Sequence, residues 1–114
     1  MRIIKVVIIL FVFVSNLAAA GVSPTPYFSI DKIRISDNTG YVYIQPKEDI
    51  TPVNQSCKRT HFFALSKNYD LFQELYSAAY SAALSGKNIR VWISTDHDDC
   101  LNGYQQVRLI EVDF

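Results

Sequence analysis

The first twenty residues are the feature that most limits what this chain can fold into. Arg2 and Lys5 precede an unbroken apolar run of nine residues, Val6–Val14. Three small residues, Ala18–Ala20, end the segment. This order is typical of a secretory signal peptide, and the apolar run is far shorter than the roughly 20 residues of a bilayer-spanning helix. We therefore predict that residues 1–20 are cleaved off, which leaves a secreted or periplasmic protein with one domain, residues 21–114, and no membrane anchor.

Removal of this segment changes the charge of the chain. The whole sequence has eleven Lys and Arg and eleven Asp and Glu, so the mature domain keeps nine basic residues against eleven acidic ones, a formal charge of −2. A domain that binds nucleic acid normally presents a basic patch. The largest basic cluster here is the pair Lys58 and Arg59, so nucleic acid is not an expected partner.

The mature domain contains two cysteines, Cys57 and Cys100. A domain of 94 residues buries only about two-thirds of the surface that its unfolded chain exposes, so its fold is marginal without a further constraint. An exported pair with no third cysteine most simply forms one disulfide. That bond closes a loop of 44 residues and contributes about 4 kcal/mol in the chain-entropy treatment. The alternative is a free, reactive Cys100 beside His97.

Apolar residues alternate with a period of two over much of the mature chain, which predicts a β-rich domain. The expected strands are residues 28–35, 41–45, 57–65, 89–94 and 104–114. The alternation slips once in the first strand, near Asp31 and Lys32, and once in the last. In the last strand Val107 and Leu109 share one side, and the apolar residues from Ile110 onward share the other. Each slip indicates a bulge or a sharp bend.

One helix is predicted between Asn68 and Gly86, where apolar residues follow the 3.6-residue repeat in two adjacent rows. Asn68 or Asp70 is expected to cap its start, and Gly86 to end it in the left-handed conformation. Two rows imply two buried faces, one on the domain's own sheet and an alanine-rich one against a second copy of the chain. The residues expected at this subunit contact are Ala78, Ala79, Ala82 and Ala83. The alternative is that these alanines only favour helix formation.

The elements follow the order strand, strand, strand, helix, strand, strand. With the helix between the third and fourth strands, this is the order of the OB-fold, a five-stranded Greek-key barrel. Two bent end strands also favour a sheet that curls until it closes, which removes exposed edges. We therefore expect a mainly β, OB-like barrel with one helix. The alternative is an open α+β sheet with one helix on its face.

Two segments resemble a known family. Leu75–Ala79 in the helix and Ser85–Ile93 around the start of the fourth strand, with a cysteine on either side, resemble the subtilase-cytotoxin B-subunit-like proteins. These are similar to the pentameric B subunits of bacterial A-plus-five-B toxins. The resemblance implies an OB-fold protomer, a homopentamer with its helices around a central pore, and recognition of host cell-surface glycans. It also implies a toxin-like A subunit as a partner for some members.

Three aromatic rings are expected to face away from the core. Tyr41 and Tyr43 alternate with apolar residues in the second strand, and Trp92 does so in the fourth. A ring with an apolar body and a polar tip suits stacking on a sugar or on a protein surface. The polar groups expected beside these rings belong to Arg90, Gln45 and Asn102. The alternative is that the rings fill a subunit contact or a second buried face.

Nothing in the residue pattern indicates catalysis or a bound metal. The acidic loop Asp96–Asp99 departs from the EF-hand pattern, because Cys100 stands where an oxygen ligand is needed. His61 and His97 have no flanking catalytic signature. We therefore predict a non-catalytic binding module without a cofactor, which recognises glycans as a homo-oligomer. The alternative is a secreted or periplasmic protein-interaction module, such as an inhibitor or an accessory subunit.

Overall fold

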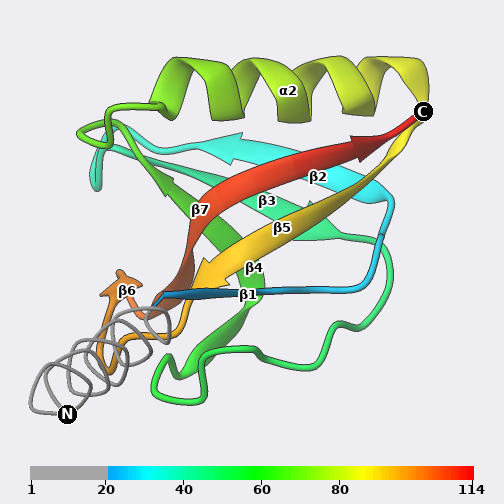
Figure 1. Ribbon diagram of the computed structural model, residues 1–114. Helices are drawn as coiled ribbons and strands as arrows, with labels where there is room; N and C mark the ends of the chain where they lie inside the picture. The colour runs from blue at the N-terminus through cyan, green and yellow to red at the C-terminus, as the bar shows by residue number, and fades with distance from the viewer. Residues whose placement is uncertain (1–20) are drawn as a thin grey trace, which may run out of the picture.

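The computed structural model describes residues 21–114 (Figure 1), and the predicted signal peptide lies outside them. Its elements are β1 (Val22–Pro24), β2 (Ile30–Ile35), β3 (Tyr41–Pro46), β4 (Arg59–Ser66), α2 (Phe72–Ser85), β5 (Asn88–Ser94), β6 (Cys100–Leu101) and β7 (Tyr104–Asp113). The predicted strands and helix are present in the predicted order, and β1 and β6 are short additions to them. The described part of the chain has no helix that is both long and apolar enough to cross a membrane.

All the strands belong to one sheet, whose order is β1-β5-β7-β4-β3-β2, with β6 attached to β7. β4 and β7 run parallel, and the other pairs are antiparallel. A parallel pair needs a long crossover connection. α2 forms part of this crossover and lies across one side of the sheet, where it contacts β7, β2, β4 and β5 (Figure 1).

The expected closed barrel is wrong, and the alternative of an open sheet with one helix on its face is confirmed. β1 and β2 are the two ends of the sheet and do not pair with each other. β1 and β2 belong to one continuous segment of the chain. The first part of this segment pairs with β5 and the second part pairs with β3, so the segment reaches both ends of the sheet. Between the two parts Phe28 makes a single bridge to Ile89. Pro24 and Pro26 lack the N–H groups that a continuous ladder needs.

The main core lies between α2 and the sheet. The rings of Phe28 and Phe63 pack together with their centroids 5.4 Å apart. Full burial of a side chain of this kind contributes about 1.5–3 kcal/mol relative to leaving it exposed. The buried residues of this core are Phe28, Val42, Ile44, Phe63, Leu65, Leu75, Ala79, Ala82, Ile89, Val91, Ile93 and Val107.

Both predicted irregularities in the end strands are present. β2 shifts its register against β3 between Ile30 and Lys32. In the last strand the shift lies elsewhere than expected: Trp92 pairs with Leu109 and Ile93 with Val107, so one extra residue is inserted between the two partners in β7. As a result Val107 is buried while Leu109 is 42% exposed. The prediction that these two side chains share a face is wrong, because the bulge turns the strand over between them.

The helix begins later than predicted and ends where it was predicted to end. Leu71 occupies the N-cap position and makes no side-chain cap hydrogen bond, so neither Asn68 nor Asp70 caps α2. Gly86 has a φ of 70°, and its N–H donates to the carbonyl of Ala82. This left-handed conformation is the reason a glycine stands there.

The four alanines expected at a subunit contact do not share one surface. Ala79 and Ala82 are buried in the domain's own core, so a second chain cannot reach them. Ala78 is half buried and Ala83 is exposed. The exposed part of α2 next to Ala83 is instead formed by larger apolar side chains, among which Leu84 is 73% exposed.

Candidate ligand-binding site

The predicted disulfide between Cys57 and Cys100 is confirmed. It joins Cys57, two residues before the start of β4, to the first residue of β6, and the two Cα atoms lie 5.6 Å apart. The turn after β6 is thereby held against the start of β4, where the N–H of Arg59 donates to the carbonyl of Gly103 at 3.0 Å. A cross-link between two distant segments therefore positions the side chains on both sides of this turn.

A second, smaller cluster of aromatic residues lies outside the main core. Tyr43 packs against Phe62 and Tyr104, with ring centroids 5.7 and 5.2 Å away. Tyr41 packs edge-on against Tyr43 at 6.4 Å. The prediction that Tyr41 and Tyr43 point away from the residues of the main core is correct. For Tyr43 the alternative of a second buried face holds, because this cluster leaves its ring only 4% exposed.

A hollow of about 260 Å³ opens beside this cluster. It is lined by Arg34, Ser36, Asn38, Thr39, Tyr43, Arg59, Phe62, Asn102 and Tyr104. The hydroxyl of Tyr43 is 3.1 Å from that of Thr39 and accepts the side-chain amide of Asn102 at 3.4 Å. The structure therefore brings together two of the predicted binding residues, Tyr43 and Asn102. We call this space the Tyr43 hollow.

The guanidinium groups of two arginines of the Tyr43 hollow lie over aromatic rings. The guanidinium carbon of Arg34 is 4.9 Å from the ring centroid of Phe62, and that of Arg59 is 5.5 Å from the ring centroid of Tyr104. The ion pairs of residues 21–114 involve only other side chains, so within this part of the chain both arginines lack a carboxylate partner. A guanidinium without a carboxylate partner can donate its N–H groups to a carboxylate or another oxyanion from outside the chain.

Trp92 and Arg90 lie in a different place. Both are on β5, which β7 and β4 separate from β3 in the sheet. The indole N–H of Trp92 donates to Glu111, and the guanidinium of Arg90 lies over the ring of Tyr27, 4.4 Å from its centroid. Both side chains are half buried. These contacts join β5 to its neighbours, and neither residue lines the Tyr43 hollow.

One carboxylate of the acidic loop pairs with a residue outside the loop. Asp99 forms an ion pair with Arg108 at 3.0 Å. Burial opposes ionisation of Asp99, but hydrogen bonds from Ser94 and Arg108 outweigh it and lower the pKa of this carboxyl group below its ordinary value. The hydrogen bond to Asp99 raises the pKa of Arg108 in turn. Within residues 21–114, no three His, Cys, Asp or Glu side chains gather closely enough to hold a metal ion.

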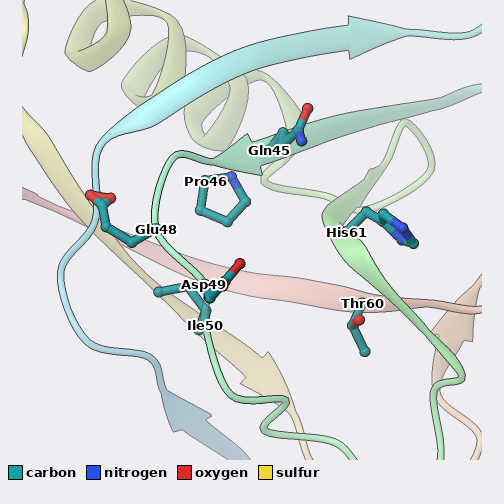
Figure 2. A pocket seen from close by; sticks show the side chains of 7 residues that line it. All are labelled: Gln45, Pro46, Glu48, Asp49, Ile50, Thr60 and His61. Atoms are coloured by element: carbon teal, nitrogen blue, oxygen red, sulfur yellow. The ribbon is translucent and has the colours of Figure 1, made fainter.

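A larger hollow of about 400 Å³ lies where β3 ends and the chain runs toward β4. Figure 2 shows the residues that line it, which are Gln45, Pro46, Glu48, Asp49, Ile50, Thr60 and His61. Gln45, which we expected beside the aromatic rings, lies here and not in the Tyr43 hollow. Its two acidic residues contrast with the two arginines of the Tyr43 hollow. We call this second space the Asp49 hollow.

The sequence did not indicate Arg34, Arg59 and Tyr104 as site residues. They come from β2, β4 and β7, and only strand pairing brings them together: Arg34 is in register with Tyr43, and Arg59 with Tyr104. No protein-family model matches this chain, and no curated protein matches it in sequence.

Proposed function

We propose that the mature chain is a secreted, non-catalytic binding module that recognises glycans with an acidic group in the Tyr43 hollow. The observation that carries this proposal is the pair Arg34 and Arg59, each stacked on a ring beside one hollow and each without a carboxylate partner in the described chain. Two positive charges whose N–H groups have no carboxylate partner in the described chain suit a carboxylate or sulfate group.

The rest of the lining suits a sugar. Sugar rings present weakly polar C–H faces to aromatic side chains, and their hydroxyls need donors and acceptors nearby. Tyr104 is half buried and contributes a partly accessible ring. The amides of Asn38 and Asn102 and the hydroxyl of Thr39 supply polar groups at the rim. The bound sugar is expected to touch Tyr43 through its hydroxyl group, since its ring is covered.

The resemblance to toxin B subunits supports one further part of the proposal, assembly into a ring of five. The helix lies between the third and fourth long strands, as that resemblance implies. The exposed apolar surface of α2, with Tyr80 and Leu84, offers a contact for another subunit. A single open site of this size binds weakly, and several copies in one assembly would raise the affinity for a cell surface. The disulfide is compatible with export.

The test is a glycan array probed with the secreted protein and with two arginine variants. Arg59→Gln and Arg34→Gln are expected to lose binding to sialylated or sulfated glycans. Arg90→Gln is the matched control, because Arg90 also stacks on a tyrosine but lies outside the hollow, and it should bind as the wild type does. Tyr43→Ala is unsuitable as a probe, because the ring is buried in its cluster.

The expected oligomer is tested separately by the mass of the protein in solution. Binding that is equal for neutral and acidic glycans, or that survives in both arginine variants, would overturn the assignment of the hollow. No binding to any glycan would favour the alternative, a protein-interaction module. One observation favours that alternative: apolar side chains of β1, of the segment after it and of β7 are exposed, namely Val22, Tyr27 and Leu109.

A further inference from the structure

Three residues of β4 have no partner in either neighbouring strand. Pairing with β3 stops at Phe63, which is opposite Ile44. Pairing with β7 passes from Arg59 directly to Phe63, because the register shifts between them. Within the described part of the chain, Thr60, His61 and Phe62 therefore lie in a strand conformation with no residue in register beside them. Such a segment can pair with an extended peptide from another chain.

The unpaired segment forms one wall of the Asp49 hollow. Thr60 and His61 are exposed and line it from β4. The loop after β3 forms the opposite wall, and Figure 2 shows the carboxyl group of Asp49 on the side of that loop that faces β4. The hollow of about 400 Å³ has room for a side chain of a peptide that runs beside β4.

The charge of the hollow limits which side chain fits. Its lining contains Glu48 and Asp49 and no lysine or arginine. Glu48 accepts the backbone N–H of Ser29 through both carboxylate oxygens, at 2.9 and 3.2 Å. Asp49 has no hydrogen-bond or ion-pair partner among residues 21–114. The nearest lysine in sequence, Lys47, lines another hollow, beside the end of α2. Asp49 is therefore free to pair with a cation from outside the chain.

We infer that the Asp49 hollow is a docking site for an extended segment of a partner protein that carries a lysine or an arginine. The segment pairs through its backbone with Thr60–Phe62 and places its basic side chain beside Asp49. This site is separate from the Tyr43 hollow, for which we propose a ligand of the opposite charge. β4 contributes Thr60 and His61 to the Asp49 hollow, and Arg59 and Phe62 to the Tyr43 hollow. The inference does not depend on the proposed glycan binding, and one can fail while the other holds.

The probes are short threonine–valine peptides, blocked at both ends, with one central lysine, glutamine or glutamate. Binding to the isotope-labelled secreted protein is followed by NMR. The lysine peptide is expected to shift the amide signals of Asp49, Thr60 and His61. It should bind roughly fivefold more tightly than the glutamine peptide, which corresponds to the upper range of an exposed ion pair, and the glutamate peptide should bind least.

Two controls separate charge recognition from backbone pairing. Asp49→Asn should reduce the affinity for the lysine peptide to that for the glutamine peptide. Asp70→Asn, which changes an exposed carboxylate in the turn before α2, should leave the affinity unchanged. A lysine peptide with N-methyl groups on alternate residues should not bind, because it cannot form the ladder. Equal affinities for the three peptides, unchanged binding by Asp49→Asn or by the N-methylated peptide, shifts centred on Asn102 and Tyr104, or the absence of any shift would each overturn the inference.

Discussion

The side-chain carbonyl oxygen of Gln105 on β7 accepts a hydrogen bond from the backbone N–H of Asn54 at 2.8 Å. The same oxygen accepts the N–H of Val53 at 2.8 Å. The side-chain amide of Asn54 in turn donates to the carbonyls of Ser94 and Asp96, at 2.9 and 2.8 Å. These bonds fasten the long loop before β4 to β7 and to the end of β5. They satisfy backbone groups that a polar loop would otherwise leave unpaired inside the protein.

Replacing Gln105 by leucine should destabilise the domain strongly. Gln105 is only 1% exposed, so Gln105→Leu keeps the size of the side chain but leaves two N–H groups without an acceptor. Each unsatisfied buried group costs about 1–3 kcal/mol, and 1 kcal/mol corresponds to roughly 4–8 °C in the melting temperature of a domain of this size. Thermal unfolding checks the effect. Gln55→Leu on the exposed side of the same loop is the control, and an equal melting temperature for the two variants would contradict this account.

Loss of the disulfide between Cys57 and Cys100 should lower the free energy of unfolding by about 4 kcal/mol, because a long loop is then free in the unfolded chain. Urea unfolding of residues 21–114, with and without reductant, measures the change. The double variant Cys57→Ser, Cys100→Ser should match the reduced wild type. Stability that does not respond to reductant would show that the bond contributes little to the fold.

The ion pair of Asp99 and Arg108 should make part of the stability depend on pH. Since the folded protein lowers the pKa of Asp99, the pair stabilises the fold above the ordinary pKa of a carboxyl group, and this contribution is lost as the pH falls through the lowered value. Both side chains are partly exposed, so the effect should stay below about 1 kcal/mol.

Urea unfolding of the wild type and of Asp99→Asn tests this pH dependence. The two proteins should differ near neutral pH and converge at about pH 2, where the carboxyl group is protonated. The exposed Asp98 gives the matched control, Asp98→Asn. A difference between wild type and Asp99→Asn that grows as the pH falls would contradict the assigned direction.

Replacing either of two neighbouring alanines of α2 by glutamate should have different effects on the stability of the domain. Ala83 is exposed, so Ala83→Glu should leave the melting temperature of the protomer almost unchanged, and in an oligomer that meets at this surface it should release monomers. Ala82 is buried in the core, so Ala82→Glu should unfold the domain by burying a charge without a partner. Light scattering and thermal unfolding of both variants distinguish the effects. A wild-type protein that is already monomeric would end the idea of a subunit contact on this helix.

Local patterns in the sequence were sufficient to predict the elements and the disulfide. Alternation marked every long strand, and the spacing of apolar residues together with Gly86 marked the helix and its end, because these signals act between residues close in the chain. The disulfide followed from a simple count of cysteines in a chain predicted to be exported. The start of the helix was predicted wrongly, because the N-cap residue of α2 is Leu71, which has no polar side chain to cap it.

The tertiary structure alone decided whether the sheet closes, which rings are buried, and which polar groups meet. Tyr43 and Trp92 looked equivalent by alternation, yet one belongs to a buried aromatic cluster and the other reaches Glu111 on a neighbouring strand. Arg34 and Arg59 meet at one hollow because strand pairing places Arg34 opposite Tyr43 and Arg59 opposite Tyr104. Alternation assigns a side chain to a face of its own strand. The neighbours on that face are set by pairing between segments far apart in the chain, and single bulges such as the one between Trp92 and Ile93 turn the following residues over.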